Sequence, residues 1–243
     1  MRAAGAPPMS RSEYELWRDA HTWDPSREGR FILERDLAPA AWIEPLLSRE
    51  SSEVPMTVPR GYDAYARIFY PFVGSGRTDV DGKMEVEFVS WSERASRNGR
   101  VADALMEIET ISTYEGNDSA LAATDTLSDE QVAALFPILT RHTASSKAWI
   151  LLWDGWGDLN ERVFGSAPKI HHEGQSLYLL SGNIDDYEEL AHVPYYFWPE
   201  DRGWCLCCHC DFYWAYLAGS AACVEEVLAV PVLDAFALRP ENA

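Results

Sequence analysis

The chain has 243 residues, and its 20 Lys and Arg against 39 Asp and Glu give a formal net charge of −19. This balance argues against a nucleic-acid partner, because affinity for the phosphate backbone comes mainly from Lys and Arg that displace bound counterions. A hydrophobic fraction of 47% with 24% charged residues is ordinary for a globular protein, and a chain of this length can bury a core without disulfides or metal ions.

The first 60 residues predict an N-terminal extension. Residues 1–10 are rich in Ala, Pro and Gly and are expected to be disordered, and residues 11–60 are expected to form a helical extension. Ser12 and Glu15 have the spacing of a capping box at the start of a helix. Four prolines interrupt the second half of the segment, so only short elements are expected there.

Residues 61–243 are expected to form one α+β domain. The segments 64–72 and 84–91 predict two strands, since the second alternates apolar and acidic residues. Asp81 and Gly82 in the loop between them favour a hairpin. The same loop matches neither a phosphate-binding P-loop nor an EF-hand, because the spacing of its Gly and Asp residues is wrong for both.

Helical spacing of apolar residues predicts helices over 101–111 and 128–142. Ser128 stands where an N-cap is expected, directly before two acidic residues that suit a helix N-terminus. Val132 begins the apolar repeat of this second helix. Pro137 is expected to kink or shorten it.

Four later segments are rich in Trp, Tyr, Ile and Leu and predict strands: 147–153, 175–180, 203–216 and 230–238. Ser220 opens a short amphipathic helix between the last two. Because strands and helices do not alternate strictly, the pattern favours a mixed or mostly antiparallel sheet flanked by helices over a doubly wound parallel sheet.

Four of the five cysteines crowd between Cys205 and Cys210. On a strand, Cys207, His209 and Asp211 would share one face and could be interpreted as a nucleophile, a base and an orienting acid, or as metal ligands. A buried strand of reduced thiols is the preferred interpretation, since free Cys packs as a small hydrophobe. We therefore assign no catalytic residue, no metal ligand and no cofactor.

The expected location is the cytoplasm. An odd number of closely spaced cysteines suits reduced thiols. The first residues lack the apolar run of a signal peptide, and no apolar stretch is long enough to cross a bilayer.

Tryptophans beside acids provide the candidate binding residues. The chain has 10 Trp, and two segments combine aromatic rings with carboxylates at expected strand ends. Rings and directional acceptors are what a pocket for a sugar, a cation or a partner's Arg would offer. The candidate binding residues are Trp153, Asp154, Trp156, Asp158, Trp198, Glu200, Asp201, Arg202 and Trp204. A third acidic cluster around Tyr187 is interpreted as a solvated face.

Three segments resemble a family of conserved hypothetical proteins from high-GC Gram-positive bacteria: GYDAYARIFYPF (61–72), WILLWDGWGDL (149–159) and YYFWPEDRGWCLCCHCDFYWAYLAGS (195–220). They cover under a third of the chain. The family pattern W-P-x-D-R-x-W-C, followed by an apolar strand and D-x-x-x-T-Y-x-x-G-S, is kept except that Ala215 replaces Thr. Three of the cysteines, Cys207, Cys208 and Cys210, are not part of that pattern. The resemblance implies no reaction, but it draws attention to Trp153, Asp154, Asp201 and Arg202.

Two functions remain open. Residues 61–243 hold 12 basic and 29 acidic residues, a balance of −17, which favours an acidic binding protein that engages a basic protein without catalysis, as immunity proteins commonly do. The alternative is an enzyme acting on a small molecule or carbohydrate, with paired carboxylates among Asp154, Asp158, Glu200 and Asp201. Neither a nucleic acid nor a membrane is expected as a partner, and the oligomeric state is left open.

Overall fold

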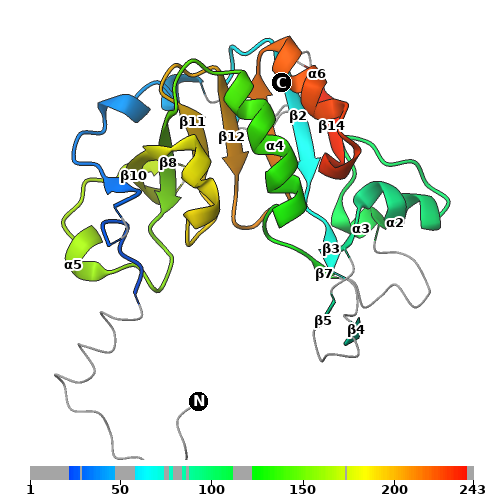
Figure 1. Cartoon of the computed structure of the whole chain (residues 1–243), viewed down its shortest axis with the longest axis horizontal. Coiled ribbons are helices and arrows are strands. Elements are labelled where there is room, and N and C mark those ends of the chain that lie inside the picture. The colour runs from blue at the N-terminus through cyan, green and yellow to red at the C-terminus, as the bar shows by residue number, and fades with distance from the viewer. Residues whose placement is uncertain are drawn as a thin grey trace, which may run out of the picture.

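A computed structural model describes residues 22–27, 29–46, 58–73, 77–78, 84–85, 88–111, 122–172 and 174–239. The main sheet has nine strands (Figure 1). Their order is β1 (Ile32–Leu33), β10 (Gln175–Asn183), β8 (Lys147–Trp153), β11 (Tyr196–Pro199), β12 (Trp204–Cys208), β13 (Trp214–Gly219), β2 (Ala64–Phe69) and β14 (Ala235–Leu238), with β9 (Ile170–His172) also paired to β10.

Every strand pair in the main sheet is antiparallel, which confirms the expected α+β class. Two smaller sheets accompany it. One has the order β6 (Phe88–Val89), β3 (Phe72–Val73) and β7 (Ala122–Ala123), and the other pairs β4 (Arg77–Thr78) with β5 (Met84–Glu85). The β4–β5 pair agrees with the expected hairpin, whose connecting residues 79–83 lie outside the described residues.

Helices cover both faces of the main sheet. On the front face in Figure 1, α4 (Asp129–Arg141) and α6 (Ala221–Leu228) pack with η4 (Ile184–Glu189) and η5 (Pro231–Leu233) over one apolar core. The second core, on the other face, is closed by η1 (Ala38–Ala40), α2 (Trp91–Arg97) and α3 (Ile108–Ile111). The remaining helical segments are η2 (Glu44–Leu46) and α5 (Glu161–Phe164). The strands are thus buried on both sides, which explains their nearly continuous apolar sequences.

Helix α4 is fixed at its N-terminus by the sequence signal that predicted it. Ser128 Oγ accepts the backbone N–H of Gln131, and Gln131 Oε1 accepts the backbone N–H of Ser128, which completes a capping box. Gln131 Nε2 also donates to the carbonyls of Phe69 (2.8 Å) and Leu233 (3.4 Å). The helix continues through Pro137 to Arg141, so the proline does not end it.

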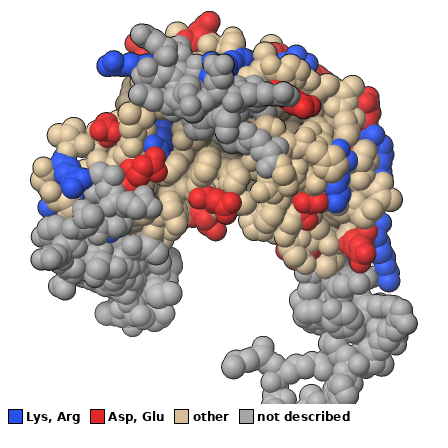
Figure 2. All heavy atoms as spheres, turned by 180° about the vertical axis from the view of Figure 1, so that it is seen from behind, with Lys and Arg blue, Asp and Glu red and all other residues tan. Residues whose placement is uncertain are grey.

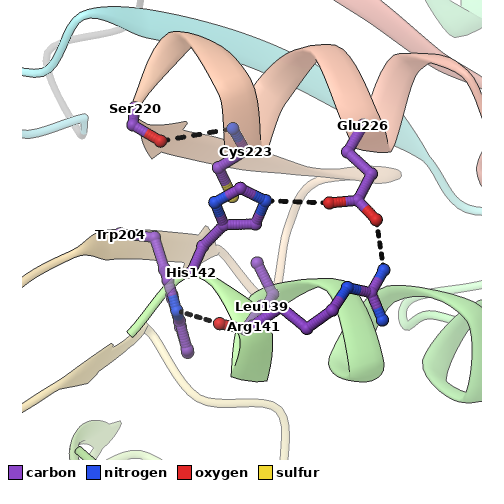
Figure 3. A network of polar contacts seen from close by, with 7 residues as sticks. All are labelled: Leu139, Arg141, His142, Trp204, Ser220, Cys223 and Glu226. Atoms are coloured by element: carbon purple, nitrogen blue, oxygen red, sulfur yellow. Dashed lines mark hydrogen bonds and ion pairs between the residues drawn. The ribbon is translucent and has the colours of Figure 1, made fainter. Parts of the chain in front are cut away.

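The C-terminal end of α4 is tied to α6 and β12 (Figure 3). Glu226 of α6 pairs with Arg141, and its Oε2 lies 2.8 Å from His142 Nε2. The Trp204 indole N–H donates to the Leu139 carbonyl over 2.9 Å. Hydrogen bonds from Arg141 and His142 hold the pKa of Glu226 below its ordinary value. Both ends of α4 are therefore held in register with the sheet.

Several expected elements differ in the structure. The strand expected over 230–238 is the 3-10 helix η5 followed by β14, and the strand expected over 64–72 is divided into β2 and β3. The strand expected over 84–91 includes β5 and β6 and ends at Val89. Helix α2 begins at Trp91 because Ser90 caps it and the Trp91 indole donates to the Tyr70 carbonyl. The helix over 101–111 is reduced to α3, since Asp103 Oδ1 accepts the Leu105 N–H and forms a local turn.

The segment 203–216 forms two strands rather than one. His209 Nδ1 accepts the Asp211 N–H, and this bond closes the turn that separates β12 from β13. His209, Cys210 and Asp211 therefore leave the strand, and the alternation expected for Cys207, His209 and Asp211 ends at Cys208.

The described part of the N-terminal segment contains short elements, as expected. The β1 strand pairs with β10 and so belongs to the main sheet. The helix expected at Ser12 and the disorder expected over residues 1–10 lie outside the described residues. Within the described part of the chain, no helix combines the length and the apolar character needed to span a membrane.

Candidate functional site

The first predicted cluster, at the end of β8, is a packed corner. Asp154 Oδ2 lies 2.8 Å from Lys169 Nζ, and the Trp153 and Trp156 rings meet edge to face at 5.9 Å. A Cβ on Gly155 would lie 2.1 Å from Trp153 Cζ2, so the ring of Trp153 occupies the space that a side chain at this position would need. The turn therefore requires glycine for packing.

His192 completes this corner, although no sequence pattern indicated it. Its ring stacks on the Trp156 ring with a centroid distance of 4.5 Å, and it packs edge-on against the Trp23 ring with a centroid distance of 5.8 Å. Nε2 lies 2.9 Å from Asp158 Oδ1. Burial lowers the pKa of His192 below its ordinary value, and the nearby Asp158 carboxylate only partly offsets this effect. His192 is thus held largely neutral near pH 7.

The second predicted cluster, after β11, is divided by the sheet. Trp198 is buried in one core and Trp204 in the other. Asp201 accepts hydrogen bonds from Thr143 Oγ1, Ala144 N and Gly203 N. Burial raises the pKa of Asp201, but these three donors outweigh burial and leave the pKa below its ordinary value. The Asp201 carboxylate therefore stabilises this turn through its hydrogen bonds.

Glu200 and Arg202 lie at the surface of the same turn. Glu200 is 3.6 Å from Lys147 Nζ, and the Arg202 guanidinium lies 5.0 Å from the centre of the Trp42 ring. Arg202 has a positive φ of 57°. A non-glycine residue in this region is uncommon and marks a tightly determined turn.

The structure does not bring the two predicted clusters together. Trp198 pairs with Trp149 and Pro199 with Ala148, so Glu200 and Asp201 lie at the Lys147 end of β8. Asp154 and Asp158 follow the other end of this strand, about 20 Å away at the usual rise per residue. The four carboxylates proposed for an enzyme are thus dispersed, and each contacts a cation, a histidine or hydrogen-bond donors of the protein. No observation favours the enzyme alternative.

A groove that the sequence did not indicate lies between α4 and η4. It consists of two adjoining hollows of about 500 Å³ each, which share Val132, Tyr187 and Glu188. The α4 wall is one helical stripe: Asp129, Val132, Ala133, Phe136, Pro137 and Thr140. The Phe136 and Tyr187 rings pack together on the floor of the groove, with their centroids 4.2 Å apart. We call this feature the α4–η4 groove.

The charged residues that line the α4–η4 groove are all acidic. They are Asp129 from α4 and Asp185 and Glu188 from η4, with His192 at one end. All three acids are exposed, and within the described residues none of them has an ion-pair partner. Their neighbours Asp186 and Glu189 differ, since both contact Arg30. The groove thus combines an apolar floor with unneutralised carboxylates.

The opposite face of the sheet has a different charge pattern. In the coloured part of Figure 2, acidic and basic side chains are interspersed among uncharged residues. The α4–η4 groove, with its three acids, lies on the other face of the sheet, which this view does not draw. The sequence signal that could have found it is the run of acids around Tyr187, which we interpreted as a solvated face.

The four thiols of the cysteine window are free, and three of them, Cys205, Cys207 and Cys208, are buried. Cys205 and Cys207 are buried, with their sulfurs 3.9 Å apart, and burial raises the pKa of the Cys207 thiol well above its ordinary value. Burial also raises the pKa of Cys208 to about 12. His209, Cys210 and Asp211 bring potential ligand atoms within 4.8 Å of one another, and His209 Nδ1 accepts the Asp211 N–H. The arrangement fits reduced structural thiols.

In comparisons with known proteins, no family model, curated protein or solved structure matches the chain.

Proposed function

We propose that this chain is a binding protein without catalysis that engages a basic protein through the α4–η4 groove, as immunity proteins engage their targets. The observation that carries the proposal is a set of three carboxylates around an apolar floor, Asp129, Asp185 and Glu188, which have no ion-pair partner among the described residues. The net charge of −19 would steer a basic partner toward the chain, and the apolar floor would hold it. The setting we propose is the bacterial cytoplasm, which suits the free cysteines.

The shape of the groove favours one kind of occupant. Its α4 wall runs from Asp129 to Thr140, a length of about 17 Å at 1.5 Å per residue. A basic amphipathic helix of about 12 residues has the matching length, with apolar side chains facing Phe136 and Tyr187 and with Lys or Arg facing the acids. Ala133 and Thr140 are small enough to let such a helix approach α4 closely.

The test uses a labelled 12-residue amphipathic peptide with Leu on one face and Lys and Arg on the other, followed by fluorescence anisotropy. We expect saturable binding that weakens at least tenfold between about 0.05 M and about 0.5 M salt, because rim charges are screened over a Debye length. A peptide with the same apolar face and Glu in place of Lys and Arg serves as the ligand control.

The variant Asp185→Lys/Glu188→Lys should lose this binding. The matched control Asp211→Lys/Glu225→Lys makes the same charge change at two exposed positions outside the groove and should bind within about twofold of the unmodified chain. Equal weakening in both variants would show that net charge alone attracts the peptide and would overturn the groove as the site.

A further inference from the structure

We propose that the outer edge of β14 pairs with β14 of a second copy of this chain to form a symmetric dimer. The main sheet ends at β14, which is paired on its inner side with β2. Within the described residues, no strand covers its outer side. An uncovered strand edge presents N–H and C=O groups that another strand can satisfy.

The register of β14 against β2 identifies which backbone groups face outward. Phe69 N donates to the Asp234 carbonyl, so Asp234 and the alternate residues Phe236 and Leu238 are the ones that bond to β2. The backbone groups of Ala235, Ala237 and Arg239 therefore point away from the sheet. These three residues are the ones available to a further strand.

Such an edge is complementary to itself. A two-fold axis at Ala237 places Ala237 opposite Ala237 of the second copy and Ala235 opposite Arg239, with both N–H···O bonds formed in each pair. Ala237 is exposed, and its methyl group leaves room for a close antiparallel approach. The same geometry needs no residue from any other protein.

The surroundings of β14 favour a second copy over a basic partner. A hollow of about 460 Å³ separates the strand from the segment Ala102–Leu105. Leu105 of this segment is 51% exposed, which places apolar surface beside the uncovered edge. Asp103 and Arg239 supply both signs of charge here. The charged residues of the α4–η4 groove are instead all acidic, so the groove would repel a second copy of this acidic chain.

The experiment is sedimentation velocity of the full chain from about 10 µM to about 1 mM, the range in which weak interfaces associate. We expect a shift from the 27.4 kDa chain to twice that mass. Ala237→Pro removes an outward N–H while leaving the bonds to β2 in place, and it should weaken the dimer about tenfold or more. Leu105→Lys should weaken it as well. The control Ile32→Lys removes an equally exposed apolar residue from β1, at the opposite edge of the sheet, and should leave the dimer unchanged.

Hydrogen exchange localises the contact. Amides of residues 235–239 should exchange more slowly at high protein concentration than at low concentration, and this difference should vanish in Ala237→Pro. A chain that stays monomeric over the whole range would overturn the proposal. So would a dimer whose strength is the same in Ala237→Pro and Leu105→Lys as in the unmodified chain. Because β14 lies outside the groove, either result leaves the groove proposal to be judged by peptide binding.

Discussion

Gln131 is the residue on which the position of α4 depends most, and replacing it with Ala tests this directly. Its side chain makes one half of the capping box and donates to two backbone carbonyls, Phe69 and Leu233, from elements far apart in the sequence. The residue is 2% exposed, so water does not replace these bonds.

The expected cost follows from these bonds. Loss of the Gln131 half of the capping box costs up to about 1 kcal/mol, since Ser128 Oγ still caps the helix. Leaving buried carbonyls without a donor costs about 1–3 kcal/mol, against a gain of a few tenths from the better helix propensity of Ala. We expect the free energy of unfolding to fall by about 3 kcal/mol. Gln131→Glu should cost at least as much near neutral pH, because a carboxylate would face two carbonyls.

Urea denaturation followed by tryptophan fluorescence measures this change, with Glu130→Ala as the control. Glu130 is exposed on the same turn of α4, and its replacement should change the free energy of unfolding by no more than about 0.5 kcal/mol. If Gln131→Ala falls within about 1 kcal/mol of that control, the long-range bonds do not hold α4 and the reasoning is refuted.

Three further predictions concern other packed sites. Gly155→Ala should lower the free energy of unfolding by about 1–3 kcal/mol, because the new methyl group displaces the Trp153 ring; thermal denaturation checks this, and an unchanged Tm would contradict it. Burial in the folded protein disfavours protonated His192, so the free energy of unfolding should fall as the pH drops below the ordinary pKa of 6.5. Urea denaturation at several pH values should show a weaker pH dependence of this free energy for His192→Gln. The Arg67 guanidinium lies 3.4 Å from the centre of the Trp214 ring and donates a hydrogen bond to the Ala104 carbonyl. Because an ammonium cannot make both contacts, Arg67→Lys should lower the free energy of unfolding by about 2 kcal/mol in urea denaturation. A decrease under about 0.5 kcal/mol would contradict this.

The parts of the fold that were predictable from the sequence depend on local signals. The capping residue Ser128 located α4, Ser220 located α6, and the apolar run over 147–153 coincides with β8. Each signal acts within a few residues of the chain, so tertiary contacts did not override it. The mostly antiparallel class followed from the order of these elements.

The parts that were not predictable depend on contacts between distant residues. Although Ser90 gives α2 a local capping signal, the docking of α2 on the sheet depends on the Tyr70 carbonyl, which accepts the Trp91 indole N–H from 21 positions away. The single strand expected over 203–216 ignored the turn that His209 and Asp211 close. These partners cannot be paired from apolar periodicity alone, because the pattern does not show which carbonyl or ring a side chain reaches.

The candidate site shows the same division. The sequence places tryptophans beside acids, and in the structure most of those acids are engaged within the protein, as Asp154 is with Lys169. The groove joins a stripe of α4 to η4, and these elements are more than 40 positions apart in the chain. Only the fold places Asp129 beside Glu188.

The central claim is that Asp185 and Glu188 recognise positive charge, and a charge-swap experiment tests it most directly. The affinity of Asp185→Lys/Glu188→Lys for two peptides is measured, one with Lys and Arg on its polar face and one with Glu at the same positions. The account predicts that the variant loses the basic peptide and gains the acidic one, while the unmodified chain has the reverse preference. If the variant keeps its preference for the basic peptide, the groove is not the recognition surface.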